Sequence, residues 1–224
     1  MPVNKRTALM VMLTHNDRTV PNAHALFDQC KHTQATLWGL KEKGLPLAQM
    51  KNLYAFMKQC GKTTVLEVVA YTEDACLAGA HMAVACGCDI LIGTVFFDKV
   101  NAFCQRHRLK YMPFVGNVSG RPSVLEGDAQ TMVREAETYL QKGVYGINLL
   151  GYRYAGNPLA LCQRVLPRVN APVCLAGGID SYAKLDEVRA LAPWAVTIGG
   201  AFFEARFGTT HPSQIDAVCA YIQG

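Results

Sequence analysis

The 224-residue sequence lacks a long hydrophobic run: no stretch of about 18 or more apolar residues occurs in it. It also lacks low-complexity segments and linker-like stretches. The first absence predicts that no helix spans a membrane and that the protein has no membrane partner. The second predicts one continuous domain over residues 1–224.

The motifs of several functional classes are missing as well. The chain has no serine nucleophile elbow and no glycine motif for a dinucleotide, and its His, Asp and Glu residues do not show the spacing of metal ligands. We therefore expect neither a metal nor another cofactor. The basic residues are scattered, so we expect no nucleic-acid partner, while the net charge of +5 is compatible with an anionic small ligand.

Cysteine is the exception to this scarcity, since the chain has nine. The number is odd, no secretory signal precedes them, and Cys86, Cys174 and Cys219 lie inside apolar runs. This pattern favours reduced, partly buried thiols in a cytoplasmic protein. Cys86 and Cys88 are too close together for the usual zinc spacing.

A strand-and-helix unit recurs along the chain, and half of the residues are hydrophobic, enough for a large core. Eight short apolar runs, whose starts are about 22 to 34 residues apart, have the spacing of βα units. The predicted strands are Ala8–Leu13, Ala35–Leu40, Thr63–Ala70, Asp89–Gly93, Tyr111–Val115, Tyr145–Leu150, Val173–Ala176 and Ala195–Ile198.

Between the runs, apolar residues spaced by three and four predict amphipathic helices. The predicted helices are Asn22–His32, opened by an Asn cap, Leu47–Gln59, Thr72–Ala85, Asp128–Gln141, Asn157–Val169, Ser181–Ala190 and Ile215–Ile222. Alternating strands and helices indicate an α/β protein with a parallel sheet. Eight units favour a (β/α)8 TIM barrel, and the alternative is an open, doubly wound sheet.

Two Gly-Gly pairs end the last two predicted strands. Gly177 and Gly178 follow the seventh strand, and Gly199 and Gly200 follow the eighth. In barrels these two loops often form a phosphate site together with a short extra helix, because glycine lets several backbone N–H groups approach one anion. The pairs therefore predict phosphate binding, although tight strand-to-helix packing would also use glycine.

The pattern "LAGGID…TIGGAFF" resembles the closing half of the ribulose-phosphate-binding barrel superfamily, over Ala171 to Glu204. That group includes phosphosugar epimerases and isomerases, barrels of histidine and tryptophan biosynthesis, and some decarboxylases and aldolases. The resemblance implies the barrel fold and a phosphate group on the substrate. The resemblance does not imply which reaction is catalysed, because it does not extend to the first half of the chain.

Reacting groups in a barrel come from the carboxyl ends of the strands, and the second and third strands carry the strongest candidates. Glu67 interrupts an apolar run, where a carboxylate is costly to bury without a partner. Lys41 ends the neighbouring strand and is the expected partner. Such a pair can serve acid–base chemistry, or can be a structural ion pair inside the barrel.

Other candidates follow the remaining strands. After the first strand, Asp17 is a further catalytic candidate, Asn16 could bind a substrate hydroxyl, and His15 is a further candidate beside them; Asn16 and Asp17 could instead cap the loop.

Thr94, Asn148 and Arg153 are predicted to bind substrate from the fourth and sixth strands. Arg121, in a long loop after the fifth strand, could clamp an anion.

Together these features predict an enzyme of carbohydrate metabolism, an isomerase or epimerase that moves a proton next to the carbonyl of a phosphosugar or phosphorylated sugar acid. One alternative is a carbon–carbon lyase of the aldolase type acting on a phosphorylated keto acid, with Lys41 forming an imine. The other is a non-catalytic barrel that senses a phosphorylated metabolite. The fold class also suggests a homodimer.

Overall fold

The computed structural model describes residues 7–224 and contains one large parallel sheet in the order β10-β11-β12-β1-β4-β5-β6-β7. Its two edge strands also meet. Phe114 pairs with Asn148 in parallel, and the backbone N–H of Asn148 donates to Pro113 O at 2.9 Å. The sheet is therefore a nearly closed (β/α)8 barrel, as the sequence predicts, and the open-sheet alternative does not hold.

Within residues 7–224 this sheet has eight strands, and each overlaps a predicted run. They are β1 (Ala8–Met12), β4 (Leu37–Lys41), β5 (Thr63–Ala70), β6 (Ile90–Thr94), β7 (Lys110–Met112), β10 (Ile147–Leu149), β11 (Val173–Leu175) and β12 (Ala195–Ile198).

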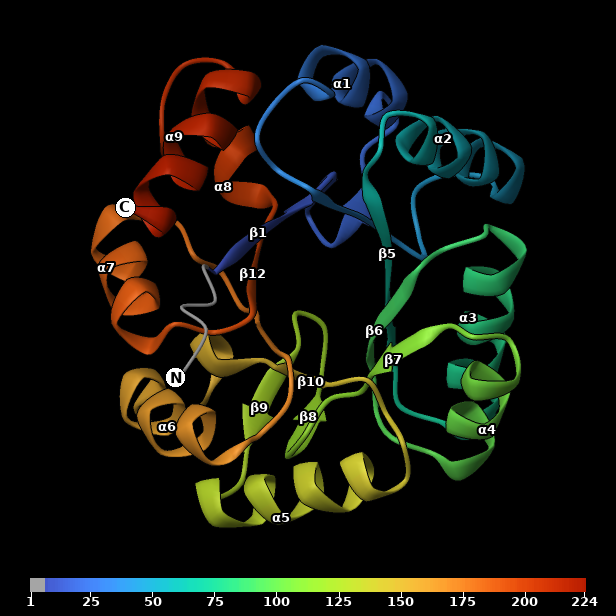
Figure 1. The fold of residues 1–224 in the computed structure, drawn as a ribbon, viewed down its shortest axis with the longest axis vertical. Helices are drawn as coiled ribbons and strands as arrows, with labels where there is room; N and C mark the ends of the chain where they lie inside the picture. The colour runs from blue at the N-terminus through green and yellow to red at the C-terminus, as the bar shows by residue number, and fades with distance from the viewer. Residues whose placement is uncertain (1–6) are drawn as a thin grey trace.

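The helices form a ring outside the strands, seen nearly along the barrel axis in Figure 1. They are α1 (Ala23–Cys30), α2 (Leu47–Gln59), α3 (Glu73–Ala85), α4 (Asp98–Arg106), α5 (Ala129–Gln141), α6 (Pro158–Val165), α7 (Tyr182–Leu191), α8 (Gly200–Phe203) and α9 (His211–Gln223). None of the helices in this part of the chain is long and apolar enough to cross a membrane.

The sequence pattern does not predict α4, because its buried face is short and partly polar. Only Val100, Asn101 and Cys104 are buried, and Asn101 is held by a hydrogen bond from its side-chain amide to Lys142 O at 2.8 Å. The buried position of Asn101 would normally hold an apolar residue, so the helical spacing of apolar residues is interrupted there.

Some predicted helix caps and ends differ from the structure. Asn22 precedes α1 without forming a side-chain cap bond. The sixth helix ends at Val165 and continues only as a 3-10 turn that contains Pro167. The last helix begins earlier than predicted, at His211, because Thr210 and Ser213 form a capping box.

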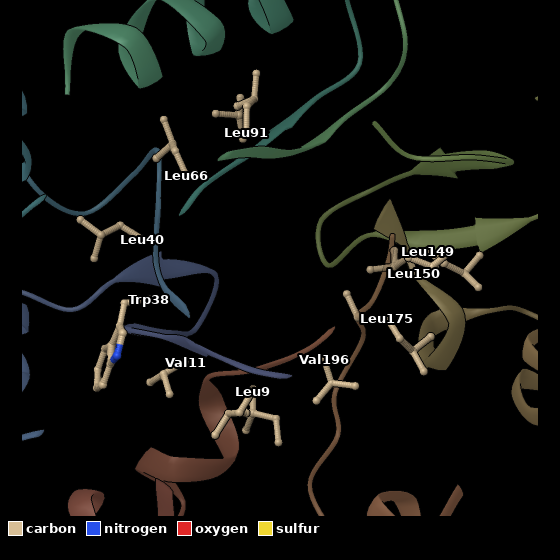
Figure 2. Close-up of a cluster of buried hydrophobic side chains, with 14 of the residues drawn as sticks. Leu9, Val11, Trp38, Leu40, Leu66, Leu91, Leu149, Leu150, Leu175 and Val196 are labelled. Carbon is tan, nitrogen blue, oxygen red and sulfur yellow. The ribbon is translucent and has the colours of Figure 1, made fainter. Parts of the chain in front are cut away.

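Two apolar layers hold the barrel together. Leu9 and Val11 of β1 belong to the layer that the strands share with the helices, whereas Met10 and Met12 belong to the cluster inside the barrel. Figure 2 shows part of the outer layer, including Leu66 of β5. The inner cluster fills the barrel below the carboxyl ends of the strands, so those ends form the floor of any site above it.

Two antiparallel hairpins project from these carboxyl ends, and the sequence reading treats both as loops. The first hairpin joins β2 (Thr14–His15) to β3 (Arg18–Thr19) after β1. The second joins β8 (Asn117–Ser119) to β9 (Val124–Glu126) after β7. Both strand pairs are shorter than the runs from which periodicity can be read.

We predict that Leu66→Ala lowers the free energy of unfolding by about 2–5 kcal/mol, because Leu66 is fully buried in the outer layer. Denaturant unfolding followed by circular dichroism measures the change. Leu47→Ala is the matched control: Leu47 is 42% exposed, so its loss should cost less than about 0.5 kcal/mol. Equal costs at the two positions would contradict the layer assignment.

Candidate functional site

A cavity of about 580 Å³ lies at the carboxyl end of the barrel. Nine of the eleven residues predicted for the site line it, and they come from the loops or ends of strands β1, β4, β5, β10, β11 and β12. They are Asn16, Asp17, Lys41, Glu67, Arg153, Gly177, Gly178, Gly199 and Gly200. The barrel topology thus brings together residues that are up to 184 positions apart in sequence (200 − 16).

One wall of the cavity consists of the two Gly-Gly pairs. Gly177 and Gly178 have φ angles of 118° and 80°, which L-residues with a side chain rarely adopt. Gly199 has no room for a side chain: a Cβ there would lie 2.7 Å from the Thr14 hydroxyl oxygen. Gly200 then begins the short helix α8. These constraints require glycine at three of the four positions and bring bare backbone to the cavity surface.

This wall, which we call the glycine cradle (Gly177, Gly178, Gly199 and Gly200), has unused hydrogen-bond donors. Within residues 7–224, no backbone carbonyl accepts from the N–H groups of Gly177, Gly178 or Gly199. The N–H of Gly200 lies in the first turn of α8, where no intrahelical acceptor exists. Backbone donors without a partner at the surface of a cavity favour an anion.

Arg153 adds a positive charge beside the cradle. It ends a 3-10 turn, Gly151–Arg153, that follows β10, and its side chain is exposed at the cavity. Its backbone packs so closely on Gly177 that a Cβ at Gly177 would lie 2.9 Å from Arg153 N. Arg153 forms no ion pair with the described residues. The guanidinium is therefore available to a ligand in the cavity.

The opposite wall carries the charged residues of β4 and β5. Lys41 and Glu67 are direct partners in the parallel register, so their side chains project from the same face of the sheet. Lys41 Nζ lies 3.8 Å from Glu67 Oε2 and also donates a hydrogen bond to Asp17 Oδ1. The structure thus forms the Lys41–Glu67 pair that the sequence led us to expect and adds Asp17 to it.

The β2–β3 hairpin places Asp17 in this wall. Its two turn residues, Asn16 and Asp17, have φ angles of 49° and 61°, as a type I′ turn requires. The Thr19 hydroxyl donates to Lys41 O at 2.9 Å and accepts from Lys41 N at 2.8 Å. Thr19 therefore fixes the hairpin to the end of β4 and holds Asp17 within reach of Lys41.

The two carboxyl groups of this wall have opposite pKa shifts. Burial raises the pKa of Glu67 above its usual value; Lys41 opposes the shift, while Glu42 and Asp17 add to it. For Asp17, partial burial also acts to raise the pKa, but the hydrogen bond and charge of Lys41, with those of Arg121, outweigh it and lower the pKa. Glu67 is thus the group suited to take up a proton, and Asp17 stays ionised.

Thr94 and Asn148 do not line the cavity. Gly93, with φ 92°, and the register shift between β5 and β6 break the alternation of β6, and the Thr94 hydroxyl instead pairs with Tyr111 OH at 2.7 Å. Asn148 is fully buried and pairs in register with Cys174 of the inner cluster. Neither atom of its amide has a hydrogen-bond partner in residues 7–224.

The cavity also contains His15, which the sequence analysis named only as a candidate in the loop after the first strand, and Thr14 and Thr197, which it did not name. Thr14 and His15 lie in the unpredicted hairpin. Thr197 lies in β12 and carries no charge that would mark it within an apolar run. A hairpin signal in "THNDRT", two possible αL residues between short β-prone pairs, could have identified the first two.

No group of three or more His, Cys, Asp and Glu residues in positions 7–224 has a geometry that could hold a metal ion. The ion pairs account for the acidic residues of the cavity: Asp180 lies 3.0 Å from Lys184 Nζ, and Glu204 lies 3.0 Å from Arg206 Nε. Each acid near the cradle therefore has a cation beside it, which offsets part of its repulsion toward an anion there.

Comparison with solved structures gives the same architecture. The chain is 14% identical to thiamine phosphate pyrophosphorylase from Pyrococcus furiosus, with a TM-score of 0.68 over 98% of this chain and 96% of that one. It is 15% identical to tryptophan synthase from M. tuberculosis in an open form with BRD0059 bound, with a TM-score of 0.70 over 99% and 94%. The fold is a (β/α)8 barrel.

A third similar structure is N-(5'-phosphoribosyl)anthranilate isomerase from Pyrococcus furiosus, with 9% identity and a TM-score of 0.67 over 96% of this chain and 98% of that chain. No family model and no curated protein sequence matches the chain. The likeness therefore establishes the barrel fold implied by the glycine pattern, and the chemistry has to be argued from the cavity itself.

We predict that Glu67→Gln raises the thermal stability of the protein near pH 7. Burial raises the folded-state pKa of Glu67 above its unfolded value of 4.5, so the ionised group destabilises the fold increasingly as the pH rises above 4.5. The gain should therefore shrink as the pH falls and vanish below 4.5. Melting temperatures measured across this range test the sign.

Glu137→Gln, at an exposed position of α5, is the control and should show no such pH dependence. A Glu67→Gln protein that is less stable than the wild type at neutral pH would mean that the ion pair with Lys41 outweighs the cost of burial.

Proposed function

We propose that the protein is an enzyme that isomerises or epimerises a phosphorylated sugar or sugar acid by moving a proton next to a carbonyl. The observation that carries this proposal is the buried Glu67–Lys41 pair in the same cavity as the glycine cradle. One wall supplies groups suited to proton transfer, and the other supplies donors suited to a phosphate. No cofactor is needed for this chemistry.

The phosphate would bind to the N–H groups of the cradle, with Arg153 as its counter-charge. Binding energy from this non-reacting end would orient the carbon skeleton toward the opposite wall. A cavity of about 580 Å³ is in the usual size range for a small-molecule site. Asn148, the middle residue of β10, is fully buried and does not line the cavity, so its unsatisfied amide would gain a partner only if a substrate oxygen reached the barrel floor.

At the reacting end, Glu67 would act as the base that removes a proton from the carbon next to the carbonyl. Its raised pKa brings it nearer to neutral pH, where a general base is most effective. The Lys41 ammonium would stabilise the enediolate oxygen that forms. Asp17 would hold Lys41 in place through its hydrogen bond. Thr94 has no part in this arrangement, because its hydroxyl bonds Tyr111.

The first test concerns the phosphate. We predict that Gly200→Asp weakens the binding of inorganic phosphate at least about tenfold, because it places a carboxylate at the anion site. A side chain fits there: a Cβ at Gly200 would lie 3.8 Å from the nearest atom, His15 Nδ1. Titration followed by ³¹P NMR measures the affinity.

Gly200→Ala is the matched control, since it adds the Cβ without a charge and should retain binding. Phosphate binding that is absent in the wild type, or unchanged by Gly200→Asp, would remove the cradle from the proposal.

The second test concerns the proton transfer. We predict that the wild type exchanges the carbon-bound hydrogen next to the carbonyl of its substrate with solvent deuterium, which ¹H NMR can follow across a panel of phosphosugars. Glu67→Gln should lose this exchange by roughly 100- to 10,000-fold. It should keep the affinity for inorganic phosphate, because Glu67 is not part of the cradle. Exchange that survives Glu67→Gln would exclude Glu67 as the base.

The same variants separate the alternatives. A carbon–carbon lyase that forms an imine on Lys41 would be trapped covalently by borohydride in the presence of substrate. In the structure, Lys41 Nζ instead contacts the carboxylates of Asp17 and Glu67. A phosphometabolite sensor would bind phosphate in the cradle but catalyse no exchange.

A further inference from the structure

The hairpin β8–β9 forms a wall of the cavity from the side of β7. Residues Arg121, Pro122 and Ser123 at its tip line the cavity. Glycines with positive φ lie directly before and after its strands: Gly116 at 78° and Gly127 at 107°. We call residues 116–127 the flap. Its base is joined to the barrel through a bridge between Leu125 and Tyr154.

Arg121 makes all the ionic contacts between the flap tip and the rest of the described chain. One guanidinium nitrogen donates to Asp17 Oδ2 at 3.0 Å, and the other donates to Glu42 Oε1 at 2.9 Å and to the carbonyl oxygen of Val69. The three acceptors belong to the loops or ends of three successive barrel strands, β1, β4 and β5. A guanidinium holds donors on separate nitrogens in one fixed plane, so it reaches acceptors on three strands at once, whereas an ammonium would have to donate from a single nitrogen.

Neutral hydrogen bonds support the same closed position. Tyr71, which follows β5, donates its hydroxyl to Gly120 O at 2.8 Å, and that hydroxyl also lies 2.8 Å from Ser123 Oγ. The flap tip is thus held down on one side of the cavity only, over the charged wall and away from the glycine cradle.

Asp17 connects the flap to that wall. Its Oδ1 accepts from Lys41 while its Oδ2 accepts from Arg121, so one carboxylate is shared by two cations. Asp17 itself sits in a two-residue turn and is 36% exposed, so the hairpin alone leaves its side chain freedom to rotate. The contact with Arg121 removes that freedom by occupying the second oxygen.

We propose that Arg121 is a positioning residue: it closes the flap over the cavity and fixes the Asp17 carboxylate as the partner of Lys41. The geometric part stands on the contacts above, whereas its consequence for catalysis rests on the proposed function. In that function the flap would shield the reacting end from water, and Lys41 would be held at one place relative to Glu67.

Hydrogen exchange of the full-length protein tests the geometric part with Arg121→Gln, Arg121→Lys and Arg134→Gln. Arg134 is an exposed arginine of α5 that bonds Thr131 within its own helix, so the last variant is a matched control. We expect Arg121→Gln to speed amide exchange at least tenfold in both the flap and residues 14–19. Arg121→Lys should lie between Arg121→Gln and the wild type, and the control should match the wild type.

The titration of Asp17, followed by ¹³C NMR of its carboxyl carbon, is a second readout that a merely structural role would not move. The charge and hydrogen bond of Arg121 help to lower the Asp17 pKa, so Arg121→Gln should raise it toward the ordinary value of 3.8. The control should leave it unchanged. Exchange in residues 14–19 within twofold of the wild type, or an unaltered Asp17 titration, would overturn the proposal.

The affinity for inorganic phosphate distinguishes a failure of the flap proposal from a failure of the proposed function. Arg121 is not part of the cradle, so Arg121→Gln should keep the phosphate affinity of the wild type. If substrate-dependent deuterium exchange is found, Arg121→Gln should lower its kcat while Arg121→Lys restores part of it. Failure of phosphate binding in the wild type would refute the phosphosugar function but not the coupling of the flap to Asp17, which hydrogen exchange decides independently.

Discussion

The Glu67 carboxylate inside the barrel is the constraint around which the site is arranged. A lone charge at this depth would be neutralised or expelled, and Lys41, its register partner on the next strand, limits that cost. Lys41 in turn needs Asp17, and Asp17 is held by a hairpin and by Arg121. Residues from elements far from β5 in sequence thus act together to place Lys41 beside the Glu67 carboxyl group.

Both hairpins of the barrel mouth are tied to the wall that holds this carboxylate. The β2–β3 hairpin is tied to the end of β4 through Thr19, and the flap is tied to the ends of β1, β4 and β5 through Arg121. The opposite side uses backbone instead of side chains. Close packing of Gly199 on Thr14, and of Gly177 on Arg153, keeps that wall rigid.

The features that could be predicted from the sequence are those with a long sequence pattern. The barrel followed from eight apolar runs, and the Lys41–Glu67 pair followed from a carboxylate within one run and a lysine at the end of its neighbour. The hairpins were missed because strands of two or three residues carry no periodicity. Thr94 was expected at the site because it ends the fourth strand, but the positive φ of Gly93 and the register shift beside it break the alternation of β6 locally.

The charges of the two walls also bear on the orientation that the proposed phosphorylated ligand would take in the cavity. The charged wall holds the carboxylates of Asp17, Glu42 and Glu67 against the cations Lys41 and Arg121, whose contacts are already made within the wall. A dianion placed there would face three carboxylates and would have to break existing ion pairs.

At the cradle, a dianion would meet N–H groups and an Arg153 that have no partner within residues 7–224, while Asp180 and Glu204 each lie beside a cation. For the proposed substrate, this charge distribution would favour one orientation, with the phosphate at the glycines and the carbonyl end at Glu67. That orientation is what a proton transfer at a single carbon requires.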